Sequence, residues 1–326
     1  MSRLLEGVRL RHHPFSLGGA LGSLLAAAGR DLPQPYVMGA SGLAFRLTLD
    51  LVISPGSPAE LNYHEQVALW ENLGAWFKRV AARPADAAFA GARAEALHRI
   101  RESVDRGYPA IAYDLLALPE YGLAVGHEGD RLACLTLNSP SAPQWMDAAG
   151  WPPEEHRQYT RAEAITLLDT APAFDRRKAE TASIRSAVEH FWSPPSRDGW
   201  LQYGLKAYEF WIAVLTAPLP MHGVNPAMSH SYNLMVLQRL RQDAAEYLTG
   251  LAPRYPNAPS LQTAAARYRE TAAALEEAIR VLPFPGTPGA LEERETKGTL
   301  AETLRKAMTA ERQGIEELER SLRALR

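Results

Sequence analysis

The 326-residue chain contains a single cysteine, Cys134, which excludes an internal disulfide and a metal site built from several thiolates. It also lacks any run approaching the roughly 20 apolar residues that a membrane-spanning helix needs. No apolar stretch of signal-peptide length precedes the charges in the opening MSRLLEGVRLRHHPF. These absences predict a cytoplasmic protein without a membrane segment.

The chain has no excess of charge of one sign, because 35 basic residues face 37 acidic ones and the formal net charge is -2. Nucleic-acid binding favours clustered positive charge, so we expect no nucleic-acid partner. Hydrophobic residues make up 46% of the chain, which is enough to form a hydrophobic core. The length favours two domains, which we place at residues 1–170 and 171–326.

The first part of the chain mixes helical and strand-like patterns. Small and apolar residues over 16–29, in SLGGALGSLLAAAG, predict a helix suited to close packing. Alternation over 45–51 predicts a strand, and steps of three and four residues predict further helices over 62–83 and 85–105. Short apolar runs then predict antiparallel strands within 108–118, 121–127, 131–138 and 159–169, with a proline-containing loop over 141–160.

The second part has helical periodicity almost throughout, and proline and glycine mark each break. The predicted helices cover 176–192, 200–216, 230–252, 259–281 and 296–326. The sequence thus predicts an α+β protein with an antiparallel sheet, followed by a mainly helical domain. In the last helix, a narrow apolar stripe that includes Leu304, Ile315 and Leu318 predicts packing within the protein, with a homo-oligomeric coiled-coil contact as the alternative.

The order of several motifs resembles that of a known family. A small-residue helix is followed by GASGLAF, by ESVDRGYPAIAYD and by PEYGLAVGHEGD. This order is similar to that of C39-like peptidase domains and of the butirosin biosynthesis protein H family, over roughly residues 8–140. The resemblance implies a papain-like domain followed by a helical domain.

The resemblance also implies where a catalytic triad would lie. The family's nucleophilic cysteine opens the first helix, where this chain has Ser16, and its histidine corresponds to Glu120. The third member corresponds to Asn138 in LNSP. A thiol at a helix amino terminus ionises readily, whereas a serine hydroxyl gains little there and an ordinary carboxylate is a weak base. The three residues are therefore catalytic candidates in a site whose family chemistry is degenerate.

Three functions remain open at this point. The first is binding of a small amine, amide or peptide-like ligand without catalysis, and the second is acyl transfer or amide hydrolysis through Ser16. The third is a structural or partner-binding role of the carboxy-terminal helices. We expect no cofactor and no metal. The ligand-binding candidates are Ser16, Glu120, Ser41, Tyr208, Trp211 and His230.

Several other polar residues have simpler interpretations. We interpret His127 as a turn histidine and Cys134 as a buried, inert strand residue. The adjacent His12 and His13 are expected to point apart and to be exposed. A polar cluster follows the predicted helix 200–216 and is typical of a site on a loop; it comprises His222, Asn225, His230, Tyr232 and Asn233.

Overall fold

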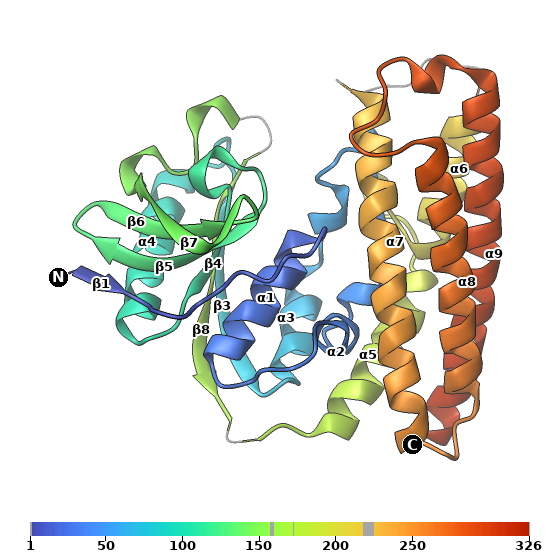
Figure 1. Cartoon of the computed structure of the whole chain (residues 1–326), viewed down its shortest axis with the longest axis horizontal. Coiled ribbons are helices and arrows are strands. Elements are labelled where there is room, and N and C mark those ends of the chain that lie inside the picture. Colours follow the sequence, from blue (N-terminus) through green and yellow to red (C-terminus); the bar gives the residue numbers. More distant parts are fainter. Residues whose placement is uncertain (1, 157–159, 172, 218–224, 326) are drawn as a thin grey trace. The chain divides into compact units, whose positions relative to one another are not determined.

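The structure is a computed structural model that describes residues 2–156, 160–171, 173–217 and 225–325 (Figure 1). It divides into two compact units. Unit 1 comprises Met1–Val37 and Trp70–Asp175, and unit 2 comprises Met38–Leu69 and Arg176–Arg326. The α+β class, the antiparallel sheet and the helical carboxy-terminal region are as predicted. Residues 38–69, which the sequence analysis placed in the first domain, pack within unit 2 instead.

Unit 1 contains one antiparallel sheet. Its strands lie in the order β3-β8-β4-β5-β6-β7, and β1 also pairs with β5. The strands predicted within 108–118, 121–127, 131–138 and 159–169 are confirmed as β4, β5, β6 and β8. The bounds are β1 Ser2–Leu4, β3 Ala75–Ala82, β4 Ala110–Tyr113, β5 Tyr121–Glu128, β6 Arg131–Thr136, β7 Ser139–Asp147 and β8 Ala162–Thr170.

The helices of unit 1 are α1 (Ser16–Ala27) and α4 (Phe89–Asp105), while α2 (Gln34–Ala40) and α3 (Tyr63–Glu71) each cross the division between the units. Ala96, Leu97 and Ile100 of α4 share a buried apolar cluster with small residues of the sheet. Short single-turn helices complete both units, at Leu43–Phe45, Ser57–Ala59, Leu115–Ala117, Ala148–Gly150, Glu154–His156, Ala252–Arg254 and Ala290–Glu292.

The prediction of one helix over 62–83 is wrong. The helix ends at Glu71, and Gly74 has a φ of 72°, a left-handed conformation that favours glycine. Burial alternates over residues 75–78, the first half of β3, and the strand pairs with β8 at the edge of the sheet. A strand can carry apolar residues at positions that also fit a helical period, and pairing with β8 decides between the two.

The predicted loop over 141–160 is also partly wrong, because Ser139–Asp147 forms strand β7. Pro140 and Pro143 disfavour a strand in the sequence, because proline lacks the N–H that a ladder requires. Among the strands that the structure describes, β7 pairs with β6 and forms the other edge of the sheet. At an edge, the missing N–H groups cost no hydrogen bond to a second neighbour.

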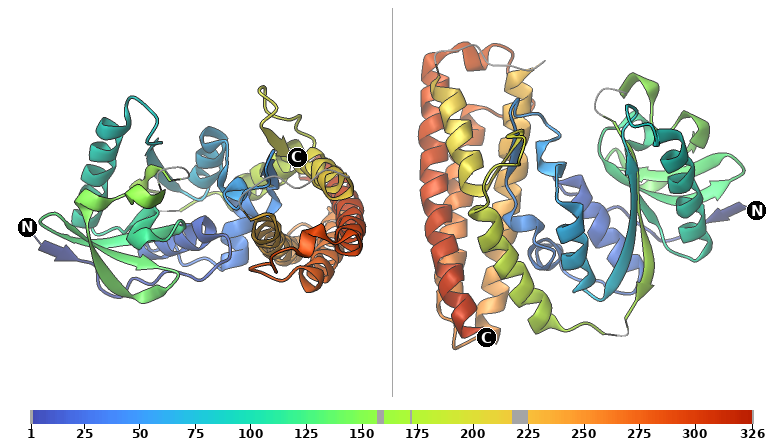
Figure 2. Two further views of the ribbon diagram at one scale, coloured as in Figure 1. Left: turned by 90° about the horizontal axis from the view of Figure 1, so that it is seen from above. Right: turned by 180° about the vertical axis from the view of Figure 1, so that it is seen from behind.

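Unit 2 is built on long helices, of which α7, α8 and α9 run side by side (Figures 1 and 2). Their bounds are α5 Arg176–Phe191, α6 Gly204–Thr216, α7 Pro226–Leu251, α8 Ser260–Val281 and α9 Arg294–Ala324. A two-stranded ladder joins β2 (Thr48–Asp50) to β9 (Leu201–Tyr203). The strand predicted over 45–51 is therefore confined to 48–50, and the helix predicted over 200–216 begins at Gly204, after β9.

The apolar stripe of α9 belongs to the core of unit 2. Leu304, Ile315 and Leu318 are each at most 1% exposed, so they pack within the unit, as expected of a packing helix. Among the residues that the structure describes, none of the helices combines the length and the apolar content that crossing a bilayer demands.

Candidate functional site

The amino terminus of α1 is held in place by the segment that precedes it. A Cβ at Gly19 would lie 2.3 Å from the Arg11 carbonyl oxygen, so glycine permits this segment to lie directly against the helix. The Arg11 N–H donates to Ser23 Oγ at 2.8 Å, one turn further along α1. These contacts fix Ser16 as the first residue of a buried helix.

Ser16 connects the start of α1 to the start of β5. Its hydroxyl donates to a Glu120 carboxylate oxygen at 2.5 Å and accepts the Tyr121 N–H at 3.0 Å. Ser16 is buried, whereas Glu120 is half-buried. A carboxylate beside a helix amino terminus is favourable, because the exposed N–H groups there carry partial positive charge. The structure thus brings together two of the three residues to which the family resemblance assigns the triad.

The other predicted residues are not part of this contact. Asn138 is exposed in the turn between β6 and β7. Ser41 belongs to unit 2, where its hydroxyl donates to the Met38 carbonyl oxygen at 3.1 Å. Its position at the end of α2 makes it a local helix-terminus contact.

An aromatic and charged cluster lies on strands β3, β4, β5 and β8. The Tyr113 and Tyr121 rings meet edge to face, with centroids 5.1 Å apart. The Arg161 guanidinium lies 4.7 Å from the Tyr113 ring centroid and donates to the Tyr121 hydroxyl at 2.7 Å. That hydroxyl donates in turn to Glu163 at 2.9 Å. Arg79 donates to the other Glu163 oxygen at 2.6 Å, so a fully buried carboxylate has two guanidinium partners.

The electrostatics of this cluster follow from those contacts. Burial acts to raise the pKa of the Glu163 carboxyl, but Arg161 and Arg79 outweigh it and hold the pKa below its usual value. Burial raises the pKa of the Tyr113 phenol well above its ordinary value, against the opposing effect of Arg161. The negative charge of Glu120 adds to that rise, which places the carboxylate within electrostatic reach of the phenol. Tyr113 therefore stays a neutral hydroxyl at physiological pH.

Sequence reasoning missed an aspartate–histidine pair at the end of β4. Asp114 has a φ of 59°, and its N–H donates to the Glu120 carbonyl oxygen at 3.0 Å. Its carboxylate accepts from His156 Nδ1 at 2.8 Å and from Thr160 Oγ1 at 2.6 Å. Because a carboxylate only accepts, His156 carries its proton on Nδ1. An aspartate after a strand is a turn signal, but a partner 42 residues away has no signal in the sequence.

Three of the simpler interpretations can be compared with the structure. His127 lies within β5 rather than in the turn, and its Nε2 contacts Asp105 at 2.8 Å. The expected exposure of His13 is wrong, because its ring is buried and its Nδ1 accepts the Phe15 N–H. Cys134 is buried in β6 as expected, and burial raises the pKa of its thiol to about 12.

The candidates of the helical region are core residues of unit 2. The Tyr208 hydroxyl donates to Glu311 at 2.8 Å, and the Trp211 indole N–H donates to His230 Nδ1 at 2.9 Å. All three candidate side chains are buried. Burial lowers the pKa of His230 to about 4, so the ring is neutral near pH 7. These contacts favour a structural role over a ligand-binding wall.

The polar cluster near the start of α7 is also explained by local structure. Asn225 caps α7 by accepting the Met228 N–H at 3.1 Å. The Asn233 amide donates to the carbonyl oxygens of Ser54 and Ser229. Tyr232 packs edge to face on a phenylalanine ring. His222 lies outside the described residues.

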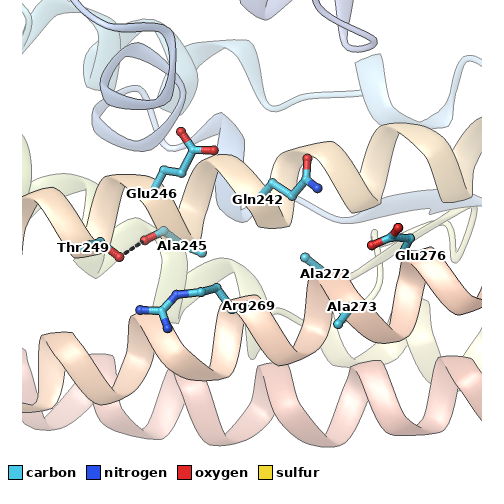
Figure 3. A pocket seen from close by; sticks show the side chains of 8 residues that line it. All are labelled: Gln242, Ala245, Glu246, Thr249, Arg269, Ala272, Ala273 and Glu276. Atoms are coloured by element: carbon cyan, nitrogen blue, oxygen red, sulfur yellow. Dashed lines mark hydrogen bonds between the residues drawn. The ribbon is translucent and has the colours of Figure 1, made fainter.

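A shallow groove of about 490 Å³ lies between α7 and α8. Figure 3 shows the side chains that line it. Its polar side chains include Gln242, Glu246, Arg269 and Glu276, and the last three are exposed. The Thr249 hydroxyl in the groove donates to the carbonyl oxygen of Ala245, within α7. This is an ordinary solvated groove between two helices. Within the described part of the chain, His, Cys, Asp and Glu form no group of three or more that could hold a metal ion.

No protein-family model matches the chain, and no curated protein matches it significantly. The geometry of Ser16, Glu120 and their surroundings is therefore what indicates a function.

Proposed function

We propose that unit 1 is a catalytically degenerate papain-like domain that binds a small amine, amide or peptide-like ligand beside Glu120. The observation that carries this proposal is the hydrogen bond from Ser16 to Glu120, which joins the first turn of α1 to the start of β5. In a papain-like enzyme these two elements carry the nucleophile and its base. Here they carry a hydroxyl and a carboxylate, which recognise polar groups better than they catalyse acyl transfer.

The state of Ser16 supports binding over catalysis. Its proton is directed to Glu120, and its oxygen accepts the buried N–H of Tyr121. Both hydrogen bonds of the hydroxyl therefore join α1 to β5, and the group that accepts its proton is a carboxylate, a weaker general base than an imidazole. The hydroxyl therefore acts as a fixed link between the helix and the strand.

Tyr113 provides the second contact in the proposed site. Within the described residues its hydroxyl has no hydrogen-bond partner, and its ring already packs against one cation, Arg161. A ligand amine would be attracted to the Glu120 carboxylate, and a ligand amide oxygen would accept from the Tyr113 hydroxyl.

Calorimetric titration with butylamine, butyramide and glycylglycinamide tests the binding function. The Glu120→Gln variant keeps an acceptor for Ser16 but removes the charge, and it should weaken butylamine binding by about tenfold, since a charge-assisted contact is worth about 1.4 kcal/mol or more. Glu128→Gln is the matched control, because Glu128 is an exposed carboxylate at the far end of the same strand. Absence of saturable binding by all three probes, or equal effects of both variants, would contradict the proposal.

The papain-like arrangement has its own test. Ser16→Cys alone should show no peptidase activity, because no imidazole replaces the family base. Adding Glu120→His should lower the pKa of the new thiol by about one unit or more, as a neighbouring imidazolium does at a helix amino terminus. The pH dependence of alkylation by iodoacetamide measures that pKa, and buried Cys134 should not contribute. An unchanged thiol pKa in the double variant would show that the two positions do not form the family's pair.

A further inference from the structure

A second pocket lies entirely within unit 2, apart from the Ser16–Glu120 site. Its volume is about 200 Å³, and its lining includes Arg46, Glu60, Glu65, His190 and Tyr203. Pockets for drug-sized ligands are usually about 300–1,000 Å³, so this one suits a smaller molecule. The ladder between β2 and β9 forms part of its wall, since Thr48 pairs with Tyr203.

Arg46 is the feature that distinguishes this pocket from a solvated hollow. Its guanidinium donates to His190 Nδ1 at 2.8 Å and to Ser186 Oγ at 3.1 Å. Within the described residues it forms no ion pair with a carboxylate, and both acceptors are neutral. Arginine side chains this deeply placed are usually paired with a carboxylate or phosphate.

The histidine beside Arg46 is fixed as a neutral acceptor. Because an arginine only donates, Nδ1 of His190 accepts and the ring carries its proton on Nε2, which lies 2.9 Å from the Leu47 carbonyl oxygen. The Leu47 N–H lies 3.0 Å from the same Nε2 and cannot donate to it in this tautomer. Burial and the positive charge of Arg46 both lower the pKa of His190, which keeps the ring neutral. The ring therefore orients the guanidinium without neutralising it. Arg46 uses one Nη for His190 and the other for Ser186, and because a guanidinium has five N–H donors it still has donors for a ligand carboxylate.

The pocket also carries negative charge. Glu60 and Glu65 line it, and Glu65 is exposed on the first turn of α3. Burial lowers the pKa of the Arg46 guanidinium, and the charge of Glu65 is the strongest opposing influence. Among the described residues, the Arg46 guanidinium donates to His190 and Ser186 and forms no ion pair with Glu65. One small pocket therefore presents a guanidinium and the exposed carboxylate of Glu65 at separate positions.

We infer that this pocket binds a small zwitterion, an amino acid or a similar molecule that carries one carboxylate and one ammonium group. The ligand carboxylate pairs with Arg46, and the ligand ammonium group lies near Glu65. The Tyr203 phenol stays protonated, because burial raises its pKa, and it offers a further hydroxyl to the ligand. A ligand with only one of the two charges meets one matching group and one repulsive group.

The test is calorimetric titration of the full chain with glycine, β-alanine and γ-aminobutyrate, which differ in the distance between their charges. Propionate and propylamine are the single-charge controls. At least one zwitterion should bind saturably below about 10 mM, and more tightly than both controls. Arg46→Lys should raise its Kd by about tenfold, because lysine cannot form the bidentate contact. If none of the three zwitterions binds, the inference is overturned.

Glu65→Gln keeps the test decisive even if Arg46→Lys perturbs folding. This exposed substitution should weaken the zwitterion by about threefold, as expected for a partly solvated ion pair. Propionate binding should stay equal or become tighter, because a repulsive charge has been removed. Glu189→Gln is the matched control, since Glu189 is also close enough to affect the pKa of Arg46 but does not line the pocket. Equal effects of both substitutions on the zwitterion, or a parallel loss of propionate binding, would refute the inference.

Discussion

The ion pair between Arg241 and Glu311 in unit 2 allows a sharp test of how the helical core is held together. Both side chains are fully buried, and Arg241 Nη2 lies 2.6 Å from Glu311 Oε1. Arg241 Nε donates to the other carboxylate oxygen at 2.8 Å, so one hydrogen bond and one close charge contact join α7 to α9. The Tyr208 hydroxyl donates to that same oxygen at 2.8 Å. Removing one charged partner therefore leaves the other buried and uncompensated.

The expected costs follow from these contacts. Glu311→Gln should lower the free energy of unfolding by about 3–5 kcal/mol, the usual cost of breaking a buried pair from one side. Arg241→Met should cost more, because Arg241 also donates at 2.9 Å to the carbonyl oxygens of Ala44 and Arg46. Each unpaired carbonyl adds about 1–3 kcal/mol. The double variant should be more stable than the sum of the single effects predicts, by up to about 3 kcal/mol, because no lone charge is left.

Equilibrium urea unfolding followed by far-ultraviolet circular dichroism measures these differences, because the helices of unit 2 dominate the signal. Glu317→Gln is the control on the same helix. Its partner Arg320 is 59% exposed, so its loss should change stability by less than about 1 kcal/mol. A cost below about 1 kcal/mol for Glu311→Gln, or strict additivity in the double variant, would refute the view that this pair is a desolvated and coupled unit.

Three further predictions concern single features of the two units. The pKa of His230 falls from 6.5 to about 4 on folding, so its contribution to stability is full above pH 6.5 and is lost as pH falls toward 4, by about 3 kcal/mol in total. His230→Asn should flatten this part of the pH–stability curve, and an unchanged curve would contradict the prediction. Gly39→Ala should destabilise unit 2 by about 1–3 kcal/mol, because the new Cβ would lie 2.0 Å from the Tyr247 ring. The control Gly298→Ala meets nothing within 4 Å and should stabilise α9 slightly. Equal shifts of the melting temperature in the two variants would contradict the prediction. Iodoacetamide should leave the native protein unmodified and its ligand binding intact, because Cys134 is buried and the pKa of its thiol is raised to about 12. Rapid stoichiometric labelling, detected by mass spectrometry, would contradict this and would show that β6 opens.

The sequence alone determined the α+β class, the strands β4, β5, β6 and β8, and the long helices from α5 to α9. These elements have a strong period of their own or end at proline and glycine, and periodicity is a local property of the chain. The resemblance to a papain-like family also singled out Ser16 and Glu120, which lie 104 residues apart and meet in unit 1.

The tertiary structure decided the features that depend on a distant partner. β3, β7 and β9 exist because a neighbouring strand pairs with them, and their own residues also suit a helix or a loop. Asp114 meets His156 across 42 residues, and Arg46 meets His190 across 144. Side chains that far apart in sequence are brought to hydrogen-bond distance by strand register and helix packing, and neither of these can be predicted from a local sequence pattern.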